Sequence, residues 1–193
     1  HTIEIPEGNQ ESYKAGYYAV LGGLDYLAQN PDKLMEMRLN FYLRGLNKTE
    51  DPKAENELVG PNGEIVGRVK NGRPKFFPDY YVIPMSLDKD NDAQEAFNMI
   101  DYFKRNGVLV KELKEDIGNY KKGDLVIDMA QAKRGYANHI LYKGSNESAW
   151  AAMYAELLVN FPDMRGFKSE PVFADGLFNG KLGEVTTTRA TRT

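Results

Sequence analysis

The stretch YYVIPM, residues 80–85, is the segment on which the predicted fold depends. Its run of aromatic and β-branched residues, closed by a proline, is typical of a strand that is buried on both faces. A helix with a regular apolar stripe is predicted to follow and to end at Asn106-Gly107. Residues 108–113 then return as a second strand. The order strand, helix, strand indicates a βαβ unit with a crossover of ordinary length.

The pattern continues with a third strand at residues 125–129 and a helix from about Gln131 to Leu141. Strands that alternate with helices favour a mostly parallel sheet with helices on both faces. The predicted fold class is therefore α/β. Residues 79–193 are assigned to a small three-layer module of this kind, which serves as an accessory domain.

Upstream of this module, residues 48–78 are predicted to be a linker and a hairpin. The first part is polar and is punctuated by Pro52, Gly60 and Pro61. The pair Asn71-Gly72 is a strong hairpin signal between two short strands. The region therefore separates the α/β module from residues 1–47.

Residues 1–47 are predicted to hold one short strand and two helices. Asn9 or Ser12 can cap the first helix, and Asn30-Pro31 is a start signal for the second helix, which runs to about Leu46. The apolar residues of the first helix recur at helical spacing and are Tyr13, Tyr17, Val20, Leu21, Leu24 and Leu27. Glycines inside this helix weaken it and are best explained by close packing against another element. We expect the chain to begin inside a larger folded domain.

Composition and charge exclude several classes of function. The net charge of −3 and the pI near 5.5 give no electrostatic footprint for nucleic acid. The chain has no Cys, so disulfides, thiolate nucleophiles and Cys-ligated zinc are excluded. No run of apolar residues reaches the roughly 18 that a membrane span needs.

The candidate catalytic residue is Glu4, which lies between Ile3 and Ile5 in a short strand closed by Pro6. A carboxylate among buried aliphatic residues is either paired or has a raised pKa, as a general base needs. An edge strand with Glu4 in solvent is the alternative. His1 and Glu4 also have the His-x-x-Glu spacing of a zinc pair, although on a strand they point to opposite faces.

Other polar residues are weaker candidates. Lys133 and Arg134 follow the third predicted strand, where α/β sheets bind ligands, so they bind an anion or simply begin a helix and face water. Asp128 and the Asp163-Met164-Arg165 stretch carry the same two interpretations. Nucleotide binding has little support, because no phosphate-binding glycine loop follows any strand, and no Gly-x-Ser-x-Gly elbow occurs.

The stretch HTIEIP, residues 1–6, followed by a turn and a long helix, resembles the end of the catalytic domain in zinc carboxypeptidases of the carboxypeptidase A type. The resemblance implies that Glu4 is the general-base glutamate, which activates a zinc-bound water. It also implies that the residues from about Ser12 to Ala28 are the final helix, which packs on the central sheet.

The α/β module resembles the region that follows the peptidase domain in larger bacterial members of that family. The matching pieces are residues 80–84, 107–110 and 123–132. Such regions are similar to flavodoxin-like folds of the class I glutamine amidotransferase type. The amidotransferase nucleophile is a Cys, which this chain lacks, so that activity is not implied.

Together, these resemblances identify the chain as the C-terminal part of a zinc-dependent metallocarboxypeptidase that is secreted or at the cell surface of a bacterium, with a cytoplasmic location left open. The implied partners are the rest of the peptidase domain and a peptide substrate, without nucleic acid or a membrane span. The family's zinc ligands cannot be assigned here, so the chain alone is expected to bind no zinc and to be inactive. A non-catalytic binding or interaction module is the alternative, and a stand-alone hydrolase with metal on His1 and Glu4 is a third.

Overall fold

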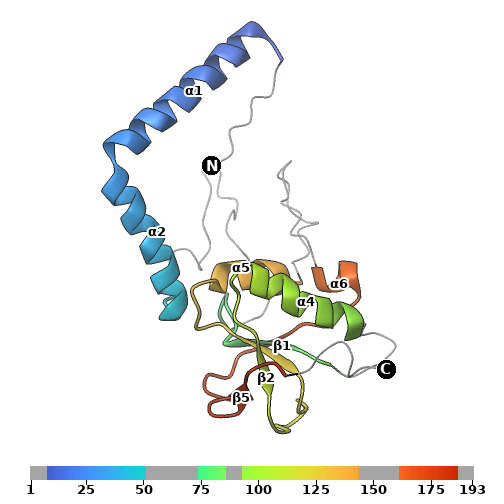
Figure 1. The fold of residues 1–193 in the computed structure, drawn as a ribbon. Coiled ribbons are helices and arrows are strands. Elements are labelled where there is room, and N and C mark those ends of the chain that lie inside the picture. Colours follow the sequence, from blue (N-terminus) through green and yellow to red (C-terminus); the bar gives the residue numbers. More distant parts are fainter. Residues whose placement is uncertain (1–7, 51–73, 86–92, 144–160, 187–193) are drawn as a thin grey trace. The chain divides into compact units, whose positions relative to one another are not determined.

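The structure is a computed structural model that describes residues 8–50, 74–85, 93–143 and 161–186. The chain divides into two compact units, residues 1–41 and 42–193. Figure 1 shows the helices and the sheet along the chain. Within the described ranges, no helix combines the length and the hydropathy that a membrane crossing requires.

The first two helices begin at the predicted capping residues. Helix α1 spans Gln10–Gln29, and the Asn9 side chain accepts a hydrogen bond of 2.8 Å from the Ser12 amide. Helix α2 spans Pro31–Leu46, with proline at its first position, where the missing N–H is not needed. The predicted starts of both helices and the end of the second near Leu46 are confirmed, whereas the short strand predicted before them lies outside the described residues.

The second unit is built on one five-stranded sheet with the order β4-β1-β3-β2-β5. Its strands are β1 (Tyr80–Ile83), β2 (Lys111–Leu113), β3 (Leu125–Asp128), β4 (Glu170–Val172) and β5 (Leu182–Gly183). All neighbouring strands pair antiparallel. In the central pair, Tyr80 lies opposite Asp128 and Ile83 lies opposite Leu125.

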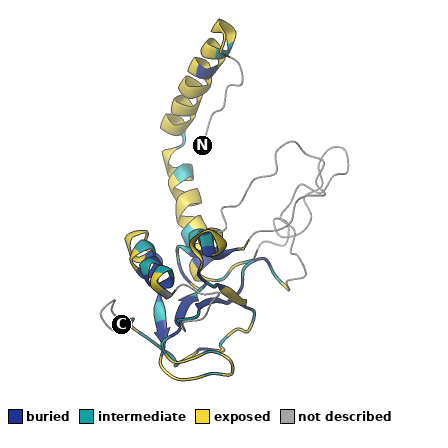
Figure 2. Cartoon of the chain, turned by 90° about the vertical axis from the view of Figure 1, so that its right-hand side faces the viewer, coloured by how far each residue is buried: buried dark blue, intermediate teal, exposed yellow. Residues whose placement is uncertain are grey.

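Alternate residues of the central strands pack into two different cores, because successive side chains point to opposite faces of a sheet. Tyr81 and Ile83 face helices α4 (Ala93–Arg105) and α5 (Arg134–Leu141), where they join Phe103 and Leu141. Tyr80 and Val82 face the other way, toward Val126 and Phe178. A short helix, α6 (Phe161–Arg165), lies beyond α5 in the chain. Figure 2 shows the buried residues gathered in the sheet and on the inner sides of its helices.

The prediction of a mostly parallel, flavodoxin-like sheet is wrong, because this sheet is antiparallel. Strands β1 and β2 do run in the same direction, but β3 is inserted between them and pairs antiparallel with both. A parallel neighbour needs a crossover of a dozen or more residues that reaches the other end of the sheet. The chain between β2 and β3 instead turns back on itself, with Ile117 and Tyr120 bridged across the turn.

Several smaller predictions concern the edges of the fold. Residues 74–77, predicted as the returning arm of a hairpin, form bends and no strand. Phe161-Pro162, predicted to end a helix, is the start of α6. The other hairpin arm, most of the linker and the helix predicted near Trp150 lie outside the described residues.

Candidate functional site

The predicted catalytic residue, Glu4, and the neighbouring His1 lie outside the described residues, so the role assigned to Glu4 stays a prediction. The other histidine, His139, is exposed on α5. Within the described part of the chain, no three His, Asp or Glu side chains gather closely enough to hold a metal ion. The groups that remain for chemistry are charged side chains around β1, β3 and the end of α2.

The loop after β3 is fixed by its own hydrogen bonds. The carboxylate of Asp128 accepts a hydrogen bond of 2.8 Å from the Ala130 amide. The buried amide side chain of Gln131 accepts from the Leu109 amide at 2.9 Å and donates to the Asp128 carbonyl at 2.6 Å. These bonds make Gln131 a structural tie between the loop and the segment before β2.

Arg134 does not face solvent but contacts the segment that follows α2. Its side chain is only 7% exposed, and Nη2 donates to the Thr49 carbonyl oxygen at 2.6 Å. Nη1 lies 3.6 Å from the Glu50 carboxylate, and the guanidinium carbon lies 4.2 Å from the centre of the Phe77 ring. The Arg134 guanidinium, which was a candidate for anion binding, therefore binds groups of the chain itself.

Lys133 and Gly45 also contribute to the contact between the end of α2 and the loop after β3. The Lys133 ammonium lies 5.4 Å from the centre of the Tyr42 ring, which is a cation–π arrangement. A Cβ at Gly45 would overlap the Gln131 carbonyl oxygen and would lie 3.2 Å from that of Ala132. Only glycine lets the last turn of α2 approach this loop so closely.

The end of α2 has the hydrogen bonds of a Schellman motif. The Thr49 amide donates to the Arg44 carbonyl at 2.9 Å, and the Lys48 amide donates to the Gly45 carbonyl at 3.3 Å. Lys48 occupies the left-handed position, with φ at +49°, which glycine usually takes. It is the one residue other than glycine with positive φ in the part of the chain that the structure describes.

The Lys48 side chain joins a charged cluster at the start of β1. Its ammonium lies 2.5 Å from Asp175 and 3.6 Å from Asp79, and it lies 5.3 Å from the centre of the Tyr80 ring. Lys75 donates to the same Asp79 oxygen at 2.6 Å. The Asp79 side chain is only 4% exposed, so two ammonium groups compensate one buried carboxylate.

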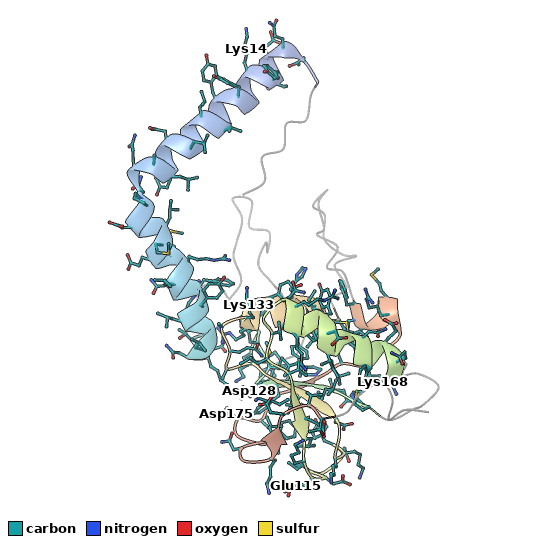
Figure 3. The ribbon with its side chains drawn as sticks, in the orientation of Figure 1. Lys14, Glu115, Asp128, Lys133, Lys168 and Asp175 are labelled. Carbon is teal, nitrogen blue, oxygen red and sulfur yellow. The ribbon has the colours of Figure 1, made fainter. Side chains whose placement is uncertain are left out.

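The electrostatics of this cluster favour the charged forms of its members. Burial opposes the charged form of Lys48, but the hydrogen bond and charge of Asp175, followed by the charges of Asp128 and Asp79, raise the pKa of Lys48 above 10.5. The hydrogen bond from Lys48, and then its charge, lower the pKa of Asp175 below 3.8. Burial, followed by the charge of Asp128, raises the pKa of the Tyr80 phenol. Figure 3 labels Asp128 and Asp175 in the sheet unit.

This arrangement suits structure better than catalysis. A nucleophilic or basic lysine needs a lowered pKa, whereas Lys48 is held protonated. A general-base carboxylate needs a pKa near the working pH, whereas Asp175 is held ionised by its lysine. The cluster therefore stabilises the packing of its own segments.

Two further polar contacts lie on the helical side of the sheet. The hydroxyls of Tyr102 and Tyr136 are 2.7 Å apart, and burial, followed by this hydrogen bond, raises the pKa of Tyr136 to about 12. Arg165 belongs to the Asp163-Met164-Arg165 stretch, which was a candidate for ligand binding, and it forms an ion pair of 3.1 Å with Glu95. Neither contact places a nucleophile beside a base.

Sequence reasoning missed four members of the charged cluster, namely Lys48, Lys75, Asp79 and Asp175. One signal was present, because Asp79 comes directly before a strand that is buried along its whole length. A buried carboxylate at such a position requires cationic partners. One of those partners, Lys75, lies four residues before Asp79, whereas Lys48 reaches Asp79 only through a tertiary contact over 31 residues of sequence.

No protein-family model, curated protein or solved structure matches this chain. The resemblance to zinc carboxypeptidases therefore stays a prediction.

Proposed function

We propose that this chain is the C-terminal part of a zinc metallocarboxypeptidase, in which Glu4 is the general base and residues 42–193 are a non-catalytic accessory unit. In this proposal the zinc ligands belong to other parts of the enzyme. The observation that carries most weight is the surface of α1, which has the composition of a helix inside a core but is exposed in this chain.

Five of the large apolar residues of α1 form one continuous stripe. Tyr13, Tyr17, Val20, Leu24 and Leu27 recur at the spacing of a single helix face. Each of them is between 48% and 73% exposed. Figure 2 shows α1 as exposed along nearly its full length. Contiguous apolar surfaces of this kind mark places where another part of a protein binds.

An adjoining face of α1, beside this stripe, carries mostly small residues, with Tyr26 among them. Its members, at helical spacing, are Ser12, Ala15, Gly16, Ala19, Gly22 and Gly23. Added Cβ atoms at Gly22 and Gly23 would have no other atom within 4 Å. Glycine costs about 1 kcal/mol relative to alanine inside a helix, so open glycines here are unfavourable for the chain on its own.

A stripe of large apolar residues beside a face of small residues is typical of a helix that packs against two neighbouring elements. In the proposal, the large side chains of α1 pack on the central sheet of the peptidase domain, and the small face accommodates a close neighbour. The glycines are then required for the close approach, as Gly45 is at the end of α2.

The α/β unit supports the non-catalytic part of the proposal. Its buried charges, including those of Asp79 and Arg134, are taken up by contacts within the chain. The second candidate function is that of an independent interaction module. The same pairing of buried charges supports it, because a unit whose charges are paired within the chain does not depend on a catalytic partner. The two candidates differ in what covers α1.

Gly22→Ala distinguishes them when it is measured in two settings. In this chain alone, we expect helical content to rise and the helix to be stabilised by about 1 kcal/mol. In the complete parent enzyme, the added methyl meets the neighbouring element, and we expect destabilisation of roughly 1–3 kcal/mol together with a loss of peptidase activity. Circular dichroism measures the change in helical content, and thermal unfolding measures the change in stability, in the isolated chain and in the parent enzyme.

A stabilising effect in both settings would contradict the proposed packing of α1. Ala19→Gly is the matched control, because it changes the same small face in the opposite sense and should destabilise the helix of the isolated chain. Metal analysis of the purified chain addresses the third hypothesis, since stoichiometric zinc in this chain would favour a stand-alone site at His1 and Glu4.

A further inference from the structure

We infer that Lys48 is an electrostatic latch, which attaches the end of α2 to the sheet as a strap that opens without unfolding the sheet. The strap consists of residues 45–50. Lys48 combines an unfavourable backbone conformation with side-chain contacts that compensate for it.

The backbone at Lys48 is the first observation. Its φ of +49° lies in the left-handed region, where a side chain is disfavoured and where a helix most often ends on glycine. Such a conformation costs on the order of 1–3 kcal/mol and persists when surrounding contacts determine it. Glycine would satisfy the backbone of the Schellman motif better, so the lysine at this position requires a different explanation.

The side chain supplies that explanation. The Lys48 ammonium is 2.5 Å from Asp175, 3.6 Å from Asp79 and 5.3 Å from the centre of the Tyr80 ring. These groups come from the start of β1 and from the loop between β4 and β5. One side chain therefore joins the end of α2 to two separate segments of the sheet unit.

The remaining contacts of the strap are polar or consist of close backbone approach. Gly45 lies against the Gln131 and Ala132 carbonyls, and Arg134 donates to the Thr49 carbonyl. The charged groups that face Lys48 are Lys75, Asp79, Asp128 and Asp175, with the Tyr80 phenol beside them. None of the strap residues from 45 to 50 belongs to either apolar core.

A segment held mainly by charges and hydrogen bonds at the edge of a core opens at a lower free energy than the core itself. The last residues of α2, from Tyr42 to Leu46, and the strap belong to the same compact unit as the sheet. The latch therefore sets how firmly the last turn of α2 is attached to the sheet.

Two substitutions separate the side chain from the backbone. Lys48→Met keeps the length of the side chain and the left-handed strain but removes the charge. Lys48→Gly removes the charge and also the strain. Lys121→Met is the matched control, because Lys121 forms an exposed ion pair of 2.9 Å with Asp116 elsewhere in the unit.

The measurement is native-state hydrogen exchange in the full chain. The reporters are the amides of Asn47, Lys48 and Thr49, which donate to carbonyls of α2, and the reference is the Leu113 amide, which donates to Asp124 in the sheet. We expect Lys48→Met to speed exchange of the reporters roughly threefold to tenfold, with little change at Leu113. Lys48→Gly loses the same charge but relieves the backbone strain, so its reporters should exchange more slowly than those of Lys48→Met, and Lys121→Met should leave exchange unchanged.

Unchanged or slower exchange of the reporters in Lys48→Met would overturn the inference, because the charge of the side chain would then add nothing to the attachment. An equal increase in the exchange rate of the Leu113 amide in Lys48→Met would overturn the inference as well, since the strap would then open only together with the sheet.

Discussion

The guanidinium of Arg134 lies 2.6 Å from the backbone carbonyl oxygen of Thr49 and thereby joins the first residue of α5 to the turn that follows α2. The bond is charge-assisted and the side chain is almost wholly buried, which are the conditions under which a hydrogen bond contributes most to stability. The same side chain approaches Glu50 and covers the Phe77 ring.

Arg134→Met is therefore expected to lower the free energy of unfolding by about 2 kcal/mol. The methionine retains much of the apolar contact with Phe77 but leaves the Thr49 carbonyl without this donor. Denaturant unfolding measures the change. The control is Arg105→Met at the exposed end of α4, where we expect a change of no more than about 0.5 kcal/mol. Equal effects of the two substitutions would contradict the role given to Arg134.

Gly45→Ala is expected to destabilise the chain by roughly 1–3 kcal/mol, because the new methyl overlaps the Gln131 carbonyl oxygen. The Cβ position is fixed by the helix backbone and the oxygen is itself a backbone atom, so neither can move aside cheaply. Gly23→Ala in the open part of α1 is the comparison, and it is expected to have the opposite sign. Thermal unfolding of the two variants tests the pair, and stabilisation by Gly45→Ala would show that the close approach is not required.

The ion pair between Lys48 and Asp175 predicts a pH dependence at the acid end. The lysine lowers the pKa of Asp175 below 3.8, so its contribution to stability is present above 3.8 and is lost as the pH falls through the lowered value. In Lys48→Met the pKa of Asp175 should rise toward its ordinary value. Titration of the Asp175 carboxyl by NMR measures this, and an unchanged pKa in the variant would contradict the pairing.

The pair of Tyr102 and Tyr136 predicts a second pH dependence at the alkaline end. Burial, followed by the hydrogen bond to Tyr102, raises the pKa of Tyr136 from 10.0 to about 12. A raised pKa means that the contribution to stability is complete below pH 10 and is lost as the pH rises toward 12. Tyr102→Phe removes the hydrogen bond and should lower the pKa of Tyr136, which ultraviolet titration of the phenolate bands detects. A value that stays at about 12 would assign the whole shift to burial.

The elements of the fold follow from local patterns in the sequence, but the arrangement of the sheet does not. The cap at Asn9, the proline start of α2 and the buried run of β1 each depend on a few neighbouring residues. The direction of β3 depends on whether residues 114–124 cross the sheet or turn back. The Gly118-Asn119 pair between Ile117 and Tyr120 was the local sign of a turn, and Gly118 does have positive φ.

The candidate sites were harder to predict for the same physical reason. Lys133 and Arg134 were correctly placed after a strand, but their partners, Tyr42 and Thr49, come from a segment more than 80 residues away. Sequence spacing carries no information about such contacts. Lys48 and Asp175 are likewise brought to the start of β1 only by tertiary contacts, whereas Lys75 lies four residues before Asp79.

The most direct test of the central proposal is the release of C-terminal residues from peptides by the complete parent enzyme carrying Glu4→Gln, with Glu7→Gln as the matched control. A general base contributes roughly 10²- to 10⁴-fold to the rate. We therefore expect kcat to fall by about that factor in Glu4→Gln, with bound zinc unchanged, and activity to be retained in Glu7→Gln. Undiminished activity in Glu4→Gln would contradict the proposed role of this chain.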